Sequence, residues 1–256
     1  LRSGIILLTW QRQEPATEAG TQRWLHDRAI GAGNLLPPIG QPQSLQVTET
    51  AAMLPPPDTV PGTYRLQATY VHRQTGESYP LAVPAVALQI DRAAPPVPAP
   101  ELDLITQLRQ LSLALPQGTS ALDPVFAEIA RINQYDPTQD YLEQAAIALE
   151  YRLQQEPQRR NWAYAVALAR ALQKRVDAAI EAFDRVVRLD SQNPYAYAYL
   201  AVVNLYDFRP DAAHTALDRA SNLNPDLPEL RVLRSVAALM QGNLRGAIEA
   251  IPPGLK

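Results

Sequence analysis

Two consecutive stretches decide how most of this chain folds. Residues 160–193 are RNWAYAVALARALQKRVDAAIEAFDRVVRLDSQN, and residues 194–227 are PYAYAYLAVVNLYDFRPDAAHTALDRASNLNPDL. Both stretches are 34 residues long and align without a gap, and the small residue Ala167 coincides with Ala201. Self-similarity at a fixed period of this size indicates stacked structural repeats, each of which needs its neighbours to bury its apolar face. The aligned pattern therefore predicts a stack of helical hairpins.

The aligned positions resemble the tetratricopeptide-repeat (TPR) family, in which one repeat has about 34 residues. The family's small residue at the start of the second helix falls on Ala179 and Ala213, and its large packing residue falls on Phe183 and Leu217. Small residues let two antiparallel helices approach closely, and the large residue fills the space against the next hairpin. The resemblance implies a non-catalytic scaffold that binds a protein or peptide partner.

Two further segments extend the helical pattern. A third copy begins at Pro228, carries Ser235 at the small position, and is halted after residue 251 by two prolines. Upstream, residues 141–157 end like a repeat without keeping the 34-residue phase, so we interpret them as a degenerate repeat. We expect a helical domain over residues 101–256, with in-phase repeats at 160–193, at 194–227 and, in part, at 228–251.

In TPR proteins the first helices of successive repeats line a concave groove. The resemblance places seven residues where side chains usually point into that groove: Asn161, Tyr164, Leu168, Tyr195, Ala198, Val202 and Tyr206. Most of these side chains are aromatic or apolar, and the basic and amide pattern with which some family members clamp a C-terminal carboxylate is missing. An alternative is that Tyr195 and Tyr199, one turn apart on a helix, pack against another element of the same chain.

Residues 1–92 have the patterning of β-strands. Polar and apolar residues alternate over residues 63–70 with the period of 2 expected of a half-buried strand. Residues 86–90 repeat the alternation beyond a turn that contains Gly76, so the two runs are expected to form a hairpin or neighbouring strands. The residues of the first run that face the core would be Tyr64, Leu66, Ala68 and Tyr70. The economical interpretation is a small antiparallel β-sandwich.

Residues 93–100, AAPPVPAP, are predicted to be a linker between the two domains. Such a segment has little surface to bury, and its proline density favours an extended, semi-rigid conformation. The predicted fold class is therefore α+β as two separate domains, with a small antiparallel β-sandwich followed by an α-helical TPR-like solenoid.

Five short motifs of the β region form a recognisable succession. They are LLTW at 7–10, WLHDR at 24–28, GAG at 31–33, PGTY at 61–64 and TGE at 75–77. The succession resembles the accessory β-sandwich of some bacterial, especially cyanobacterial, membrane glycosyltransferases. This resemblance implies an extracytoplasmic module tethered to a membrane protein, and it supplies an alternative function to the scaffold. The chain opens with Leu1 almost directly before an apolar strand, so we expect it to be a fragment of a longer protein.

Composition and motifs argue against chemistry and against several partners. The chain has 23 Lys and Arg against 26 Asp and Glu, a net charge of -3, so we expect no nucleic-acid partner. With no Cys and only three His, we expect no cofactor, no metal site and no enzymatic activity. Trp10 and Trp24 could form a sugar-stacking platform, but in a small sandwich tryptophans are more often part of the core.

Overall fold

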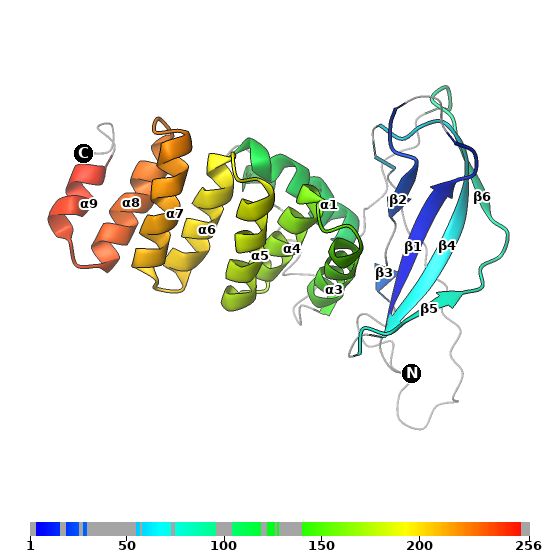
Figure 1. Cartoon of the computed structure of the whole chain (residues 1–256), viewed down its shortest axis with the longest axis horizontal. Coiled ribbons are helices and arrows are strands. Elements are labelled where there is room, and N and C mark those ends of the chain that lie inside the picture. Colours follow the sequence, from blue (N-terminus) through cyan, green and yellow to red (C-terminus); the bar gives the residue numbers. More distant parts are fainter. Residues whose placement is uncertain are drawn as a thin grey trace. The chain divides into compact units, whose positions relative to one another are not determined.

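The computed structural model separates the chain into a β unit and a helical unit. It describes residues 4–15, 19–25, 28–29, 55–56, 58–72, 75–95, 104–118, 122–125, 127 and 140–251. The compact units comprise residues 1–107 with 136–148, and residues 108–135 with 149–256. All the described strands lie in the first unit, together with the helical residues 104–107 and 140–148, and the stacked helices that Figure 1 shows after residue 160 lie in the second. The predicted α+β class is confirmed.

One antiparallel sheet carries all the strands in the described ranges. Its centre is the long pair β1 (Gly4–Arg12) and β4 (Gly62–His72), in register with Leu8 opposite Ala68. The other edge of β1 pairs with β2 (Arg23–Leu25) and β3 (Arg28–Ala29), and the other edge of β4 pairs with β5 (Ser78–Leu81) and β6 (Ala87–Ile90). The second sheet of the predicted sandwich is not among these strands.

The core of the sheet follows the predicted alternation over the first part of β4. Tyr64 and Ala68 are buried as expected, but beyond Ala68 the buried residue is Val71, and Tyr70, which was expected to face the core, is only half-buried. Strand β6 pairs with β4, so the two runs predicted to be neighbours are confirmed. Trp10 and Trp24 are buried, with ring centroids 5.9 Å apart, and Tyr64 joins their cluster. The two tryptophans therefore form core packing, and the sugar-platform alternative is wrong.

The helical unit repeats with the predicted period. First helices α4 (Arg160–Leu172), α6 (Pro194–Tyr206) and α8 (Pro228–Met240) begin at intervals of 34 residues. Second helices α5 (Val176–Leu189), α7 (Pro210–Leu223) and α9 (Leu244–Ala250) keep the same interval. Prolines open α6, α7 and α8, where the missing N–H belongs to a group that has no partner within the helix. The helices therefore recur at the 34-residue interval seen in the sequence.

Close helix contact occurs at the residues that the repeat predicts. Ala167, Ala201, Ala179 and Ala213 have almost no exposed surface, and Phe183 is buried at the large position. In the third copy, Ser235 donates its hydroxyl to the carbonyl of Ala247 at 2.9 Å, which joins α8 to α9. A serine at this position satisfies its own polar group within the helix pair and keeps the close approach.

Helical segments also precede the repeats. Helix α1 (Leu104–Ala114) continues into the short 3₁₀ helix η1 (Leu115–Gln117), residues 122–125 are helical, and α3 (Asp140–Gln155) ends shortly before α4. The predicted linker lies largely outside the described residues, and its role as the domain boundary stays a prediction. None of the helices within the described ranges is long and apolar enough to span a membrane.

Candidate functional site

The first helices of the repeats meet a segment of the same chain. Tyr199 on α6 is buried, and its hydroxyl donates to the backbone carbonyls of Leu115 at 2.9 Å and Gly118 at 3.3 Å. Asn193, the N-cap of α6, donates its side-chain amide to the carbonyl of Pro116 at 2.9 Å. Three carbonyls of the η1 segment are thus bound by the N-cap of α6 and by a tyrosine near the middle of that helix.

Gly118 is the residue that lets this segment approach so closely. Its φ is 108°, a backbone conformation that residues other than glycine rarely adopt. A Cβ atom there would lie 2.4 Å from the ring of Tyr195. Tyr195 and Tyr199 therefore pack against an element of the same chain, which is the alternative that the sequence left open.

A buried carboxylate fixes the neighbouring part of the repeat face. Asp190, between α5 and α6, accepts hydrogen bonds from the Tyr164 hydroxyl at 2.9 Å, the Arg160 guanidinium at 2.8 Å and the Asn193 amide at 3.1 Å. Burial, and next the charge of Asp190, raise the pKa of Tyr164 far above its ordinary value. The side chain of Tyr164 is 0% exposed, so in this structure it organises the repeat and presents no surface to a partner.

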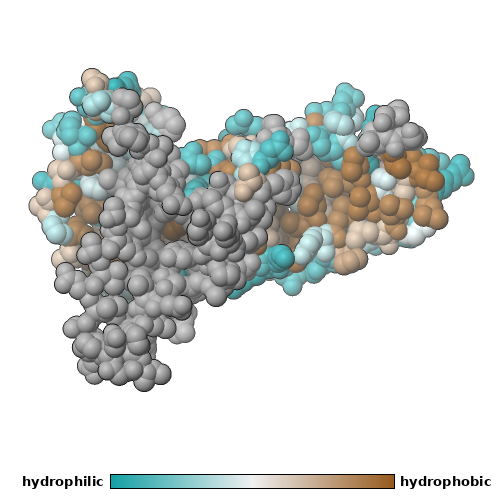
Figure 2. All heavy atoms as spheres, turned by 180° about the vertical axis from the view of Figure 1, so that it is seen from behind, coloured by the Kyte–Doolittle hydropathy of each residue, from teal (hydrophilic) through white to brown (hydrophobic). Residues whose placement is uncertain are grey.

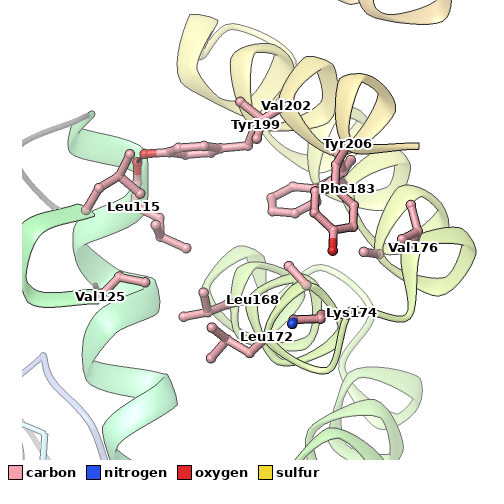
Figure 3. A pocket seen from close by; sticks show the side chains of 14 residues that line it. Leu115, Val125, Leu168, Leu172, Lys174, Val176, Phe183, Tyr199, Val202 and Tyr206 are labelled. Atoms are coloured by element: carbon pink, nitrogen blue, oxygen red, sulfur yellow. Dashed lines mark hydrogen bonds between the residues drawn. The ribbon is translucent and has the colours of Figure 1, made fainter. Parts of the chain in front are cut away.

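A cavity of about 360 Å³ opens between this segment and the repeats. Figure 3 shows its walls, which come from η1 and residues 122–125, from α4 and α5, and from α6. Its lining is apolar except for the hydroxyls of two tyrosines and one cation. The lining side chains are Leu115, Leu122, Val125, Leu168, Ala171, Leu172, Lys174, Val176, Ala179, Phe183, Tyr199, Val202, Val203 and Tyr206.

Three of the seven predicted groove residues come together in this cavity. Leu168 lines it as a buried residue, and Val202 and Tyr206 form its rim with 45% and 61% of their surface exposed. The other four do not line it: Asn161 and Tyr195 are half-buried, and Tyr164 and Ala198 are buried. The part of the predicted groove that is open to solvent is therefore the C-terminal end of α6 and its surroundings.

Apolar surface continues from α6 onto α8. Val236 stands one period after Val202 and is also exposed, and Val232 and Leu239 are exposed one turn to either side of it. Figure 2 shows hydrophobic residues, in brown, gathered on the surface of the C-terminal helices. Contiguous exposed apolar surface is uncommon on monomeric proteins unless it meets a partner.

Two residues of this region were missed by reasoning from groove positions. Lys174 (φ 58°) and Phe208 (φ 56°) occupy the turn between the two helices of their repeats in the left-handed conformation. Gly242 (φ 74°) has the same place in the third repeat, one period further on. The signal was present in the sequence, because Lys and Phe align at the 34-residue spacing with a glycine.

These observations define the second unit as a stack of TPR-like helical hairpins with an open apolar cavity on its first helices. Among the described residues, no group of three or more His, Asp or Glu side chains could hold a metal ion. The absence of enzymatic activity stays a prediction.

Comparison with known proteins finds likeness in structure and none in sequence. No protein-family model and no curated protein matches the chain. Two crystal structures of MamA are similar over 57% of this chain. One has a TM-score of 0.41, 16% identity and 81% of its own length covered, and the other has 0.40, 15% and 88%. No comparison links the β region to glycosyltransferases, and the membrane tether and extracytoplasmic location stay predictions.

Proposed function

We propose that this chain is a non-catalytic protein-interaction module that binds an apolar peptide segment of a partner protein on the concave side of its TPR-like repeats. The observation that carries the proposal is the apolar cavity rimmed by Val202 and Tyr206. Both side chains are exposed, whereas the rest of α6 is buried or half-buried. Exposed apolar area of this kind is unfavourable in water and marks interaction sites.

The shape of the surface favours a peptide over a small molecule. The cavity volume falls within the range of about 300–1,000 Å³ that is usual for ligand pockets. The apolar row nevertheless continues beyond the cavity, from Val202 to Val236 on the next first helix. An elongated occupant with apolar side chains spaced along it can cover both parts, as amphipathic segments do in apolar grooves.

The test is selection of a displayed library of random peptides with the whole chain as bait. We expect enrichment of peptides with several large apolar residues. Tyr206→Ala should then weaken an enriched peptide about 5- to 30-fold, the effect of losing an aromatic hot spot worth about 1–2 kcal/mol. Tyr79→Ala is the matched control, because Tyr79 is a similarly exposed tyrosine on β5. If no peptide is enriched, or if both variants bind like the parent, the proposal is wrong.

A further inference from the structure

The two left-handed turns stand out because a glycine would fit both of them better. A left-handed backbone brings Cβ close to the backbone carbonyl, so residues other than glycine adopt it at an energetic cost. Positions that keep such a cost are concentrated at functional sites. Gly242 shows that the repeat accepts glycine at this place. Lys174 and Phe208 therefore call for an explanation other than folding.

Folding does not use the side chain of Phe208. This ring is 81% exposed, more than any other large apolar residue that the structure describes, and it belongs neither to the cluster of α6, α7 and α8 around Leu217 nor to the tryptophan cluster of the sheet. It follows Tyr206 closely, so two exposed aromatic side chains stand at the end of α6. Arg209 makes this turn firm, because it pairs with Asp207 at 2.5 Å and with Asp177 of the preceding repeat at 2.7 Å.

The edge of the cavity beside Tyr206 also carries a positive charge that no described carboxylate pairs with. Lys174 lines the cavity and is exposed, and its ammonium has no ion pair with any described residue. The nearby carboxylates of Asp177 and Asp207 are both engaged by Arg209. An apolar cavity with a single unpaired cation at its rim is complementary to an apolar segment that carries a negative charge. Figure 3 shows Lys174 and Tyr206 on the same side of the cavity.

We propose that Lys174 and Phe208 are partner-binding residues, and that the peptide recognised by this chain has an acidic side chain beside its apolar ones. The acidic group meets the ammonium of Lys174 while apolar side chains enter the cavity and cover the rings of Tyr206 and Phe208. This inference rests on the proposed peptide-binding function and names the chemistry of the partner.

Glycine substitution separates a binding role from a structural one. Phe208→Gly and Lys174→Gly should each keep the fold and raise the melting temperature by about 1–3 °C, because strain is relieved and no packing is lost. Phe208→Gly should weaken an enriched peptide about tenfold. A residue kept for stability would behave in the opposite way: its replacement would lower the melting temperature and leave affinity unchanged.

Charge reversal tests the acidic group. Peptides selected from the random library should contain Asp or Glu, and Lys174→Glu should weaken them about tenfold or more. The same peptides with Lys in place of the acidic residue should recover most of the loss, as a complementary pair does. Arg245→Glu, an exposed cation on α9, is the control and should change little. Apolar peptides without acidic preference, bound equally by Lys174→Glu and Phe208→Gly, would overturn this inference alone. No enriched peptide at all would overturn the proposed function with it.

Discussion

Removal of the Tyr199 hydroxyl should loosen the chain's own segment from the repeats. Tyr199→Phe keeps the ring, whose centroid lies 6.0 Å from that of Phe183, and deletes only the donor to Leu115 and Gly118. The carbonyl of Leu115 then keeps only the backbone N–H of Gly118 as a donor, at 3.2 Å, and the buried carbonyl of Gly118 loses the hydroxyl that donates to it. Leaving a buried acceptor without its partner costs about 1–2 kcal/mol. For a helical unit of this size the loss corresponds to a fall of about 3–8 °C in melting temperature.

Tyr197→Phe is a matched control on the same helix. The Tyr197 hydroxyl is exposed and donates to the carbonyl of Ser191 at a longer distance of 3.3 Å. Because water can replace this bond, the change should stay within about 0.5 kcal/mol. Thermal melting followed by far-ultraviolet circular dichroism compares the two variants, and hydrogen exchange of residues 108–118 shows whether the segment is released. Equal melting and equal exchange in both variants would refute the reasoning.

Three further outcomes follow from the described contacts. Gly118→Ala should destabilise the helical unit by about 1–3 kcal/mol, because of backbone strain and the clash with Tyr195. In a double-mutant melting series, Tyr195→Ala should relieve the part of this loss that is due to the clash. Ala201→Trp should cost about 1–3 kcal/mol or more by overpacking, whereas Val202→Trp, on the exposed neighbour, should melt close to the parent. The raised pKa of Tyr164 means that the folded state holds its proton more tightly than the unfolded chain, so stability is full below about pH 10 and declines above it. Urea titrations at rising pH should show a smaller decline for Tyr164→Phe, and an equal decline would contradict the assignment.

The repeat stack could be predicted because its constraints act on side chains at a fixed spacing. Two helices approach closely only where a residue such as Ala201 is small, so the requirement recurs every 34 residues and is visible in one sequence. The alternation on β4 is visible for the same reason, since Tyr64 and Ala68 share the buried face of one strand. No pattern of this kind indicated a second sheet, and the sandwich was inferred only because it is the simplest arrangement for a small antiparallel domain.

The packing of residues 115–118 against α6 could not be predicted, because most of the hydrogen bonds that hold this segment are accepted by backbone atoms. The acceptors for Tyr199 and Asn193 are the carbonyls of Leu115, Pro116 and Gly118, and every residue has a carbonyl. The sequence therefore showed two tyrosines capable of packing within the chain but did not show against what. The left-handed conformation of Lys174 and Phe208 could have been predicted. Both align with Gly242 at the 34-residue spacing, and a glycine in a turn between helices indicates a positive φ.

The two ends of α6 now have different explanations, and this difference supports the proposed site. Asn193 at the start of α6 and Tyr199 near its middle donate hydrogen bonds to the chain's own segment, so this part of the groove is covered by the protein itself. At its end, Val202 and Tyr206 have apolar surface that no described residue covers. Leu115 lines the cavity with its side chain while its carbonyl binds Tyr199, so the segment is a wall of the cavity and leaves its mouth open. The exposed end of α6 is therefore where we propose that the partner binds.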